Sequence, residues 1–95
     1  MKVYLTAIVK AKPDQVDVLK SVLQEMVINS RKEQACLQYD LHQSLEDKNI
    51  FIFNEIWANQ AGLDLHNNQP YLKAFQTESK AIIDEVIIYK SNKIS

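Results

Sequence analysis

The stretch Ile50-Phe51-Ile52-Phe53-Asn54-Glu55-Ile56-Trp57 carries the strongest strand signal in the chain, because β-branched and aromatic residues fill most of its positions. Side chains alternate between the two faces of a strand. One face therefore presents Phe51, Phe53, Glu55 and Trp57. The other face presents Ile50, Ile52, Asn54 and Ile56. We expect the aromatic face to lie under helices and the isoleucine face to lie on the outer side of a sheet.

The segments before this strand predict a strand, a helix and a second strand. Residues 2–10 are rich in strand-forming residues and end at the Lys12-Pro13 step. Residues 36–42 alternate apolar and polar side chains, and the polar turn 46–49 joins them to residues 50–57 as a hairpin. Pro13 is expected to open a long helix. Its apolar residues recur at three-and-four spacing: Val16, Leu19, Val22, Leu23, Met26 and Val27.

The segments after it predict two short helices. Asn59 can cap a helix over residues 60–66, which Asn67-Asn68 interrupts. Pro70 suits the first turn of another helix that ends near Lys80.

The chain then ends in a segment with the character of a last strand. Residues 82–89 are apolar at nearly every position, as expected for a strand covered on both faces. Residues 90–95 are expected to form a loose tail or to cross to a partner subunit. The order β-α-β-β-αα-β predicts one α+β domain over residues 1–95, of the ferredoxin-like βαββαβ type, with a four-stranded antiparallel sheet and helices on one face. The bare isoleucine face predicts a homodimer that pairs two sheets.

Composition and charge exclude several classes of protein. The 95 residues are 46% hydrophobic and 24% charged, which is ordinary globular usage. The net charge of -1, with scattered Lys and Arg, lacks the basic patch of a nucleic-acid binder. No apolar run approaches the roughly 20 residues that span a bilayer. A single cysteine and no N-terminal signal pattern favour the cytoplasm, and Cys36 is expected to pack as a small apolar residue.

Glu55 is the residue that conflicts with its surroundings. A carboxylate on the aromatic face costs several kcal/mol to bury unless it is paired or protonated. His66 is the leading partner, and such a pair would depress the pKa of the carboxyl. The pair could deprotonate a phenol or enol, or it could be a structural brace that ties a helix to the sheet.

Trp57 shares that face and also has two interpretations. It can form the wall of a pocket for a flat ligand, or it can be an ordinary core residue. His42 falls on the polar side of its strand and is expected to be solvated. Because the two histidines have no paired Cys or short His spacing, no metal site is expected.

A set of spaced residues resembles the signature of the antibiotic biosynthesis monooxygenase (ABM) family. It combines a Glu-x-Trp strand end with a Leu-x-x-His helix step and a proline before an aromatic residue: Asn54-Glu55-Ile56-Trp57, Ala61, Leu63, His66, Pro70 and Tyr71. The Lys12-Pro13 step and the opening of the strand at Cys36 to Tyr39 are also similar to the family.

The resemblance implies a dimeric α+β barrel. Members of the family include cofactor-independent oxygenases of anthrone-like polyketides, quinol oxidases, haem degraders and an isomerase of a phosphorylated signalling sugar. Many relatives carry a second histidine directly after the proline, where this chain has Tyr71. The haem-binding positions fall near Thr6 and Phe75, which offer no iron ligand, so haem degradation is not expected.

The resemblance favours a small cofactor-independent monooxygenase that acts on a quinol, a polyphenol or a similar aromatic or enolic metabolite with O2. Glu55 and His66 are the expected catalytic pair. The expected substrate-binding residues are Phe51, Phe53, Trp57, Leu63, Tyr71 and Phe75. The alternatives are a non-catalytic dimeric module for ligand binding or stress response, and an isomerase of a small signalling metabolite.

Overall fold

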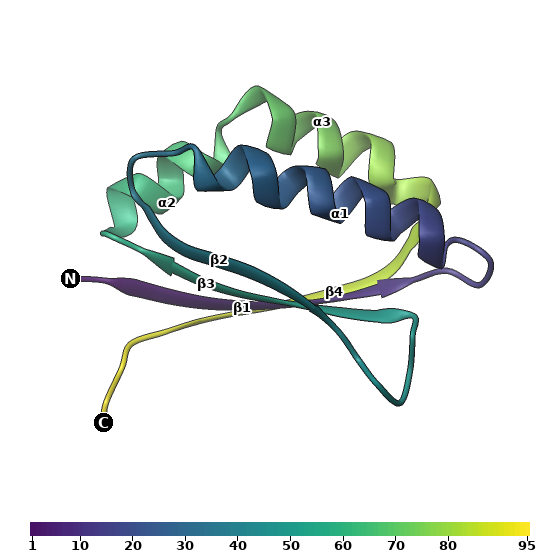
Figure 1. The fold of residues 1–95 in the computed structure, drawn as a ribbon. Helices are drawn as coiled ribbons and strands as arrows, with labels where there is room; N and C mark the ends of the chain where they lie inside the picture. Colours follow the sequence, from purple (N-terminus) through teal and green to yellow (C-terminus); the bar gives the residue numbers. More distant parts are fainter.

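The segments of secondary structure follow the order expected from the sequence (Figure 1). The structure is a computed structural model that describes all residues, 1–95. The strands are β1 (Val3–Ala11), β2 (Cys36–Gln43), β3 (Ile50–Trp57) and β4 (Ile83–Ser91). The helices are α1 (Val16–Arg31), α2 (Gln60–Asn67) and α3 (Pro70–Glu78), and a short 3-10 turn, Ser79–Ala81, leads into β4. None of the helices is long and apolar enough to cross a membrane.

The four strands form one antiparallel sheet in the order β2-β3-β1-β4. All the helices cover the same face of this sheet (Figure 1). β3 is an inner strand, with β2 on one side and β1 on the other, so its aromatic face lies beneath the helices. The architecture confirms the ferredoxin-like α+β fold.

The helix-facing side of the sheet forms the core. Phe51, Phe53 and Trp57 of β3 are at most 3% exposed, and Leu19 and Leu23 of α1 have no exposed surface. Exposure alternates strictly along β3, which confirms the two faces expected from its sequence. Burying large aromatic and aliphatic side chains contributes most of the favourable free energy of folding in a domain of this size.

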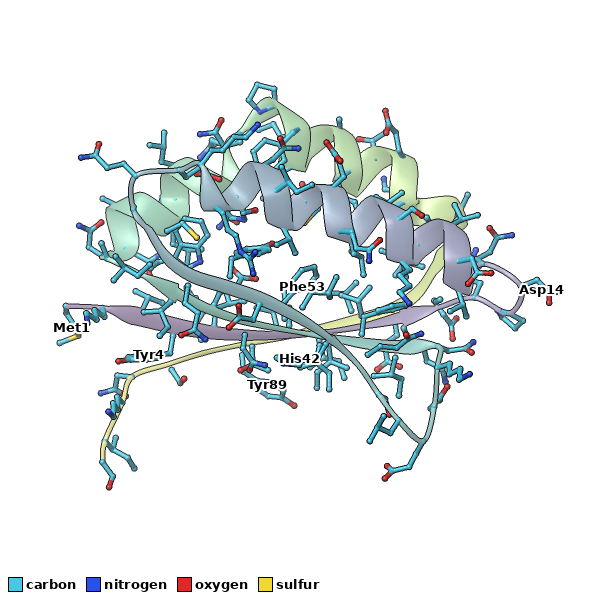
Figure 2. All side chains as sticks on the ribbon, in the orientation of Figure 1. Met1, Tyr4, Asp14, His42, Phe53 and Tyr89 are labelled. Atoms are coloured by element: carbon cyan, nitrogen blue, oxygen red, sulfur yellow. The ribbon has the colours of Figure 1, made fainter.

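The opposite side of the sheet carries the isoleucine face of β3. Ile52 and Ile56 are half-buried there. Figure 2 shows Tyr4, His42 and Tyr89 on this side of the sheet, away from the helices. No helix covers this face (Figure 1).

α1 begins later than the sequence suggested. The expected start at Pro13 is wrong, because Asp14 has a φ of 66°, in the left-handed region, and the helix therefore begins at Val16. Val22 is 36% exposed and lies outside the buried stripe. The stripe that packs on the sheet is Leu19, Leu23, Met26 and Val27.

β2 is irregular at its start. The pairing passes from Cys36 opposite Trp57 to Gln38 opposite Ile56, which leaves Leu37 without a partner and 51% exposed. Cys36 is half-buried against the core, as expected of a packing residue. Burial, reinforced by nearby Glu55 and by Glu33, raises the pKa of the Cys36 thiol to about 11.

β4 differs from its prediction in exposure and in length. It is an edge strand that pairs only with β1, and Val86 and Ile88 are 48% and 58% exposed. Its apolar character therefore does not reflect two faces covered within one chain. Lys90 and Ser91 belong to the strand, so only residues 92–95 form a tail, which leaves the sheet (Figure 1).

Candidate functional site

A cavity of about 110 Å³ lies between the sheet and helices α2 and α3. Its apolar walls come from β1, β3, α2 and α3 and include Phe53, Leu63 and Phe75. Val86 and Ile88 of the exposed edge strand also line it, so its mouth lies beside β4. Glu55 and His66 contribute the carboxyl and imidazole groups of the wall. The cavity therefore combines an apolar interior with two groups that can exchange protons.

Glu55 reaches the cavity from the middle of the sheet. In the register it lies between Leu5 of β1 and Tyr39 of β2, and it is 6% exposed. The indole N–H of Trp57 donates a hydrogen bond of 2.9 Å to Oε1 of Glu55. Burial raises the pKa of Glu55 from 4.5 to about 7, against the opposing effect of the Trp57 hydrogen bond and with a further increase from nearby Glu33. The carboxyl can therefore both accept and release a proton near neutral pH.

α2 places His66 against the core. Oδ1 of Asn59 caps the helix by accepting the N–H of Gly62 at 2.7 Å, which confirms the predicted cap. Gly62 packs so closely on Ala35 that an added Cβ would lie 2.3 Å from the Ala35 Cβ. This contact holds α2 against the connection between α1 and β2. The imidazole of His66 is 4.4 Å from the Trp57 ring, centre to centre.

His66 is paired with a carboxylate that the sequence did not single out. Its Nδ1 lies 2.7 Å from Oε2 of Glu33, in the α1–β2 connection. The Tyr71 hydroxyl donates to the same Oε2. Oγ of Ser30, in the last turn of α1, lies 3.1 Å from that hydroxyl. The four side chains form one partly buried hydrogen-bonded cluster.

The expected bond between Glu55 and His66 is therefore wrong. Glu55 accepts from Trp57, and His66 pairs with Glu33. The direction of the Glu55 pKa is also opposite to the expectation, because burial dominates where no cation is adjacent. Glu55 and His66 still line the same cavity, so their expected catalytic roles stay a prediction.

The predicted substrate-binding residues divide into two groups. Phe53, Leu63 and Phe75 line the cavity. Phe51, Trp57 and Tyr71 do not. Trp57 has no exposed surface, which places it in the core rather than on a pocket wall.

Phe51 and Tyr71 face other hollows. Phe51 lines a hollow of about 520 Å³ between α1 and β2, and Tyr71 lines one of about 440 Å³ between α1 and α3. These hollows are larger than the cavity, but neither contains Glu55 or His66. They lack a buried group able to exchange a proton with a ligand, so the smaller cavity is the candidate site. Burial and the Glu33 carboxylate raise the pKa of the Tyr71 hydroxyl.

Glu33 was missed because it lies in a connection with no periodic pattern. One signal could have found it. The hairpin register sets Cys36 opposite Trp57, so the residues just before Cys36 must lie near the end of β3 and the start of α2. His42 and Asn54 lie apart from the site. His42 is exposed, as expected, and its Nδ1 lies 3.5 Å from Nδ2 of Asn54.

The fold and the cavity define a small ferredoxin-like α+β domain with an apolar cavity between its sheet and its helices. The chain matches the model of the family described as "Antibiotic biosynthesis monooxygenase" over residues 3–78, and it belongs to this family. "Uncharacterized protein sll1783" of Synechocystis is 33% identical over 85 residues, which cover 86% of this chain and 58% of that protein. "Putative monooxygenase YcnE" of Bacillus subtilis is 30% identical over 81 residues, which cover 85% of each chain.

Solved structures share the fold of this chain. The crystal structure of PA3566 from Pseudomonas aeruginosa superposes with a TM-score of 0.95 at 32% identity, covering 99% of this chain and 95% of that one. The structure of Rv0793 from Mycobacterium tuberculosis superposes with a TM-score of 0.93 at 21% identity, covering 100% and 97%, which shows the shared fold.

Proposed function

We propose that the protein is a cofactor-independent monooxygenase that oxidises a quinol or a related phenolic or enolic metabolite in this cavity. The observation that carries the proposal is a cavity with apolar walls whose lining includes both a carboxyl of pKa about 7 and an imidazole. The volume of about 110 Å³ approaches the roughly 150 Å³ of an engineered cavity that binds benzene. The mouth beside β4 would allow a larger substrate to protrude.

Proton removal is the step that the protein would supply. A phenol or enol that loses its proton to Glu55 or His66 becomes an electron-rich anion, which can pass electrons directly to O2. One oxygen atom then enters the product and the other leaves as water. The substrate supplies all four electrons that O2 accepts, as when a quinol becomes a hydroxyquinone. The apolar walls would exclude bulk water from the oxygenated intermediate.

The proposal includes a homodimer. The face of the sheet opposite the helices carries Ile8, Ile52, Ile56 and Ile87, and a second copy of the chain would cover it. Because the cavity lies on the helix-facing side of the sheet, the dimer would bury the opposite face and leave the cavity lining intact.

Oxygen uptake tests the activity. The protein is mixed with a panel of quinols and catechols in an oxygen electrode, with a chelator and without added flavin. We expect uptake above the blank, and a loss of roughly 10²- to 10⁴-fold on removing a group that acts as general base, in Glu55→Gln or His66→Gln. Asp64→Asn is the matched control, because Asp64 is exposed on α2 and its side chain bonds only to Gln60.

An uptake no greater than the blank for every compound would contradict the proposal. Binding of the same compounds without turnover, followed by Trp57 fluorescence, would then favour the ligand-binding alternative. Uptake that survives both Glu55→Gln and His66→Gln would separate the activity from this cavity.

A further inference from the structure

The cluster behind the cavity wall contains more groups than a simple brace requires. The side chains of Glu33, His66, Tyr71 and Ser30 meet in a partly buried cluster, although they come from the α1–β2 connection, α2, α3 and α1. The side chains of Glu33 and His66 are 11% and 4% exposed. Only His66 of these four residues also lines the cavity.

The geometry of Glu33 constrains the imidazole. A carboxylate oxygen only accepts hydrogen bonds, so the 2.7 Å separation between Oε2 of Glu33 and Nδ1 of His66 requires a proton on Nδ1. The Tyr71 hydroxyl uses its own proton toward the same oxygen, so at 3.1 Å the Ser30 hydroxyl donates to Tyr71. The bonds from His66 on α2 and from Tyr71 on α3 therefore hold Oε2 of Glu33 in place.

The second ring nitrogen is left for the cavity. Nε2 of His66 has no hydrogen-bond partner within the chain, and the one buried, unpartnered side-chain nitrogen or oxygen atom in the protein is Oε1 of Glu33. Since Nε2 has no partner and is not among the buried unpartnered atoms, it keeps some accessible surface. His66 is part of the cavity lining. The ring is also held in orientation by Trp57, at 4.4 Å and an interplanar angle of 37°.

We propose that Glu33 is the positioning residue of the site: it holds His66 as the Nδ1–H tautomer, so that Nε2 presents a lone pair to a phenolic or enolic hydroxyl in the cavity. The inference rests on the proposed function for its substrate class. The hydroxyl proton passes to Nε2, and the electrons of the O–H bond stay on the substrate oxygen. The imidazolium that forms is stabilised by the Glu33 carboxylate through the bond already present.

Nitrogen-15 NMR of the ligand-free protein tests the tautomer. We expect His66 in the Nδ1–H form at neutral pH, whereas a free histidine side chain prefers the Nε2–H form. Glu33→Ala should shift His66 toward the Nε2–H form. Tyr71→Phe, which keeps the contact between Glu33 and His66, should leave the tautomer unchanged, as should Glu46→Ala in the exposed β2–β3 turn. Nε2–H or doubly protonated His66 in the unmodified protein would overturn the inference.

A chromogenic phenol tests whether the orientation has chemical consequences, which a brace would not have. 4-Nitrophenol is added at a pH where the free probe is largely protonated, and the absorbance of its phenolate is measured on binding. We expect the phenolate-to-phenol ratio of the bound probe to fall about ten-fold or more in Glu33→Gln, because the variant keeps the side-chain volume and removes the charge that favours the imidazolium. Glu46→Gln should behave as the unmodified protein.

The outcomes separate this inference from the proposed oxygenation. Both measurements are made without turnover and without oxygen, so they are decided even if no quinol is oxidised. Equal phenolate ratios in the unmodified protein and Glu33→Gln would overturn the positioning role. A probe that leaves the His66 resonances unperturbed at saturating concentration would overturn the claim that Nε2 faces a site for phenols.

Discussion

Replacing Glu55 with glutamine should make the protein more stable at pH 8 than it is with the natural carboxyl. The side chain is 6% exposed, and burial raises its pKa from 4.5 to about 7. Between these two pH values the unfolded carboxyl is ionised while the folded one keeps its proton. The folded state thus binds more protons, and its stability falls as the pH rises through this range.

The size of the effect follows from the same shift. Each pKa unit corresponds to about 1.4 kcal/mol, so a rise from 4.5 to about 7 corresponds to roughly 3 kcal/mol of stability lost above pH 7. The glutamine side chain of the variant would carry no charge, and its amide oxygen could still accept the Trp57 N–H that Glu55 accepts at 2.9 Å. The difference in free energy of unfolding between Glu55→Gln and the unmodified protein should therefore increase by roughly 3 kcal/mol from pH 4.5 to pH 8.

Urea unfolding at a fixed protein concentration measures this difference, with Trp57 fluorescence and circular dichroism as two signals. Comparing the two proteins at each pH removes the contributions of the other ionisable groups. Glu46→Gln, in the exposed turn, should keep the pH dependence of the unmodified protein. A difference that does not change with pH, or that changes in the opposite direction, would refute the account of Glu55 as a carboxyl whose pKa is raised by burial.

Three further substitutions test the packing and the assembly. Trp57→Ala should lower the free energy of unfolding by about 3 to 5 kcal/mol, measured by urea unfolding with circular dichroism, because the side chain has no exposed surface; a loss below about 1 kcal/mol would return Trp57 to a pocket wall. Gly62→Ala should lower the free energy of unfolding by about 1 to 3 kcal/mol, because the added Cβ would clash with the Cβ of Ala35. Adding Ala35→Gly to this variant should restore part of the loss, and additive losses from the two substitutions would contradict the contact. Ile52→Glu should dissociate or unfold the proposed dimer, because it buries an unpaired charge; light scattering that finds the unmodified protein monomeric at micromolar concentration would remove the dimer.

The elements of the fold were predictable because their signals are local. Strict alternation in residues 50–57 predicted the bounds and both faces of β3, and the polar turn before it predicted the hairpin. Asn59 is a cap whose partner is only three residues away at Gly62. The start of α1 was mispredicted since a proline favours a first turn, but the left-handed Asp14 follows it and delays the helix.

The site was only partly predictable because its contacts are distant in sequence. The alternation of side chains along β3 correctly placed Glu55 among aromatic residues. It could not choose between Glu55 and Glu33 as the partner of His66, since that choice depends on how α2 packs against the α1–β2 connection. Nor could it decide the exposure of Trp57, which is set by His66 and Tyr39 closing over the ring from outside the strand.

Isotopic labelling tests the central claim most directly. The protein is incubated with a quinol under heavy-isotope oxygen gas, and the product and the water are analysed by mass spectrometry. The account predicts one labelled atom in the product and one in water, with labelling of the product lost in Glu55→Gln or His66→Gln and retained in Asp64→Asn. Product that carries no label, or label that is equally abundant without the protein, would contradict a monooxygenase that acts through this cavity.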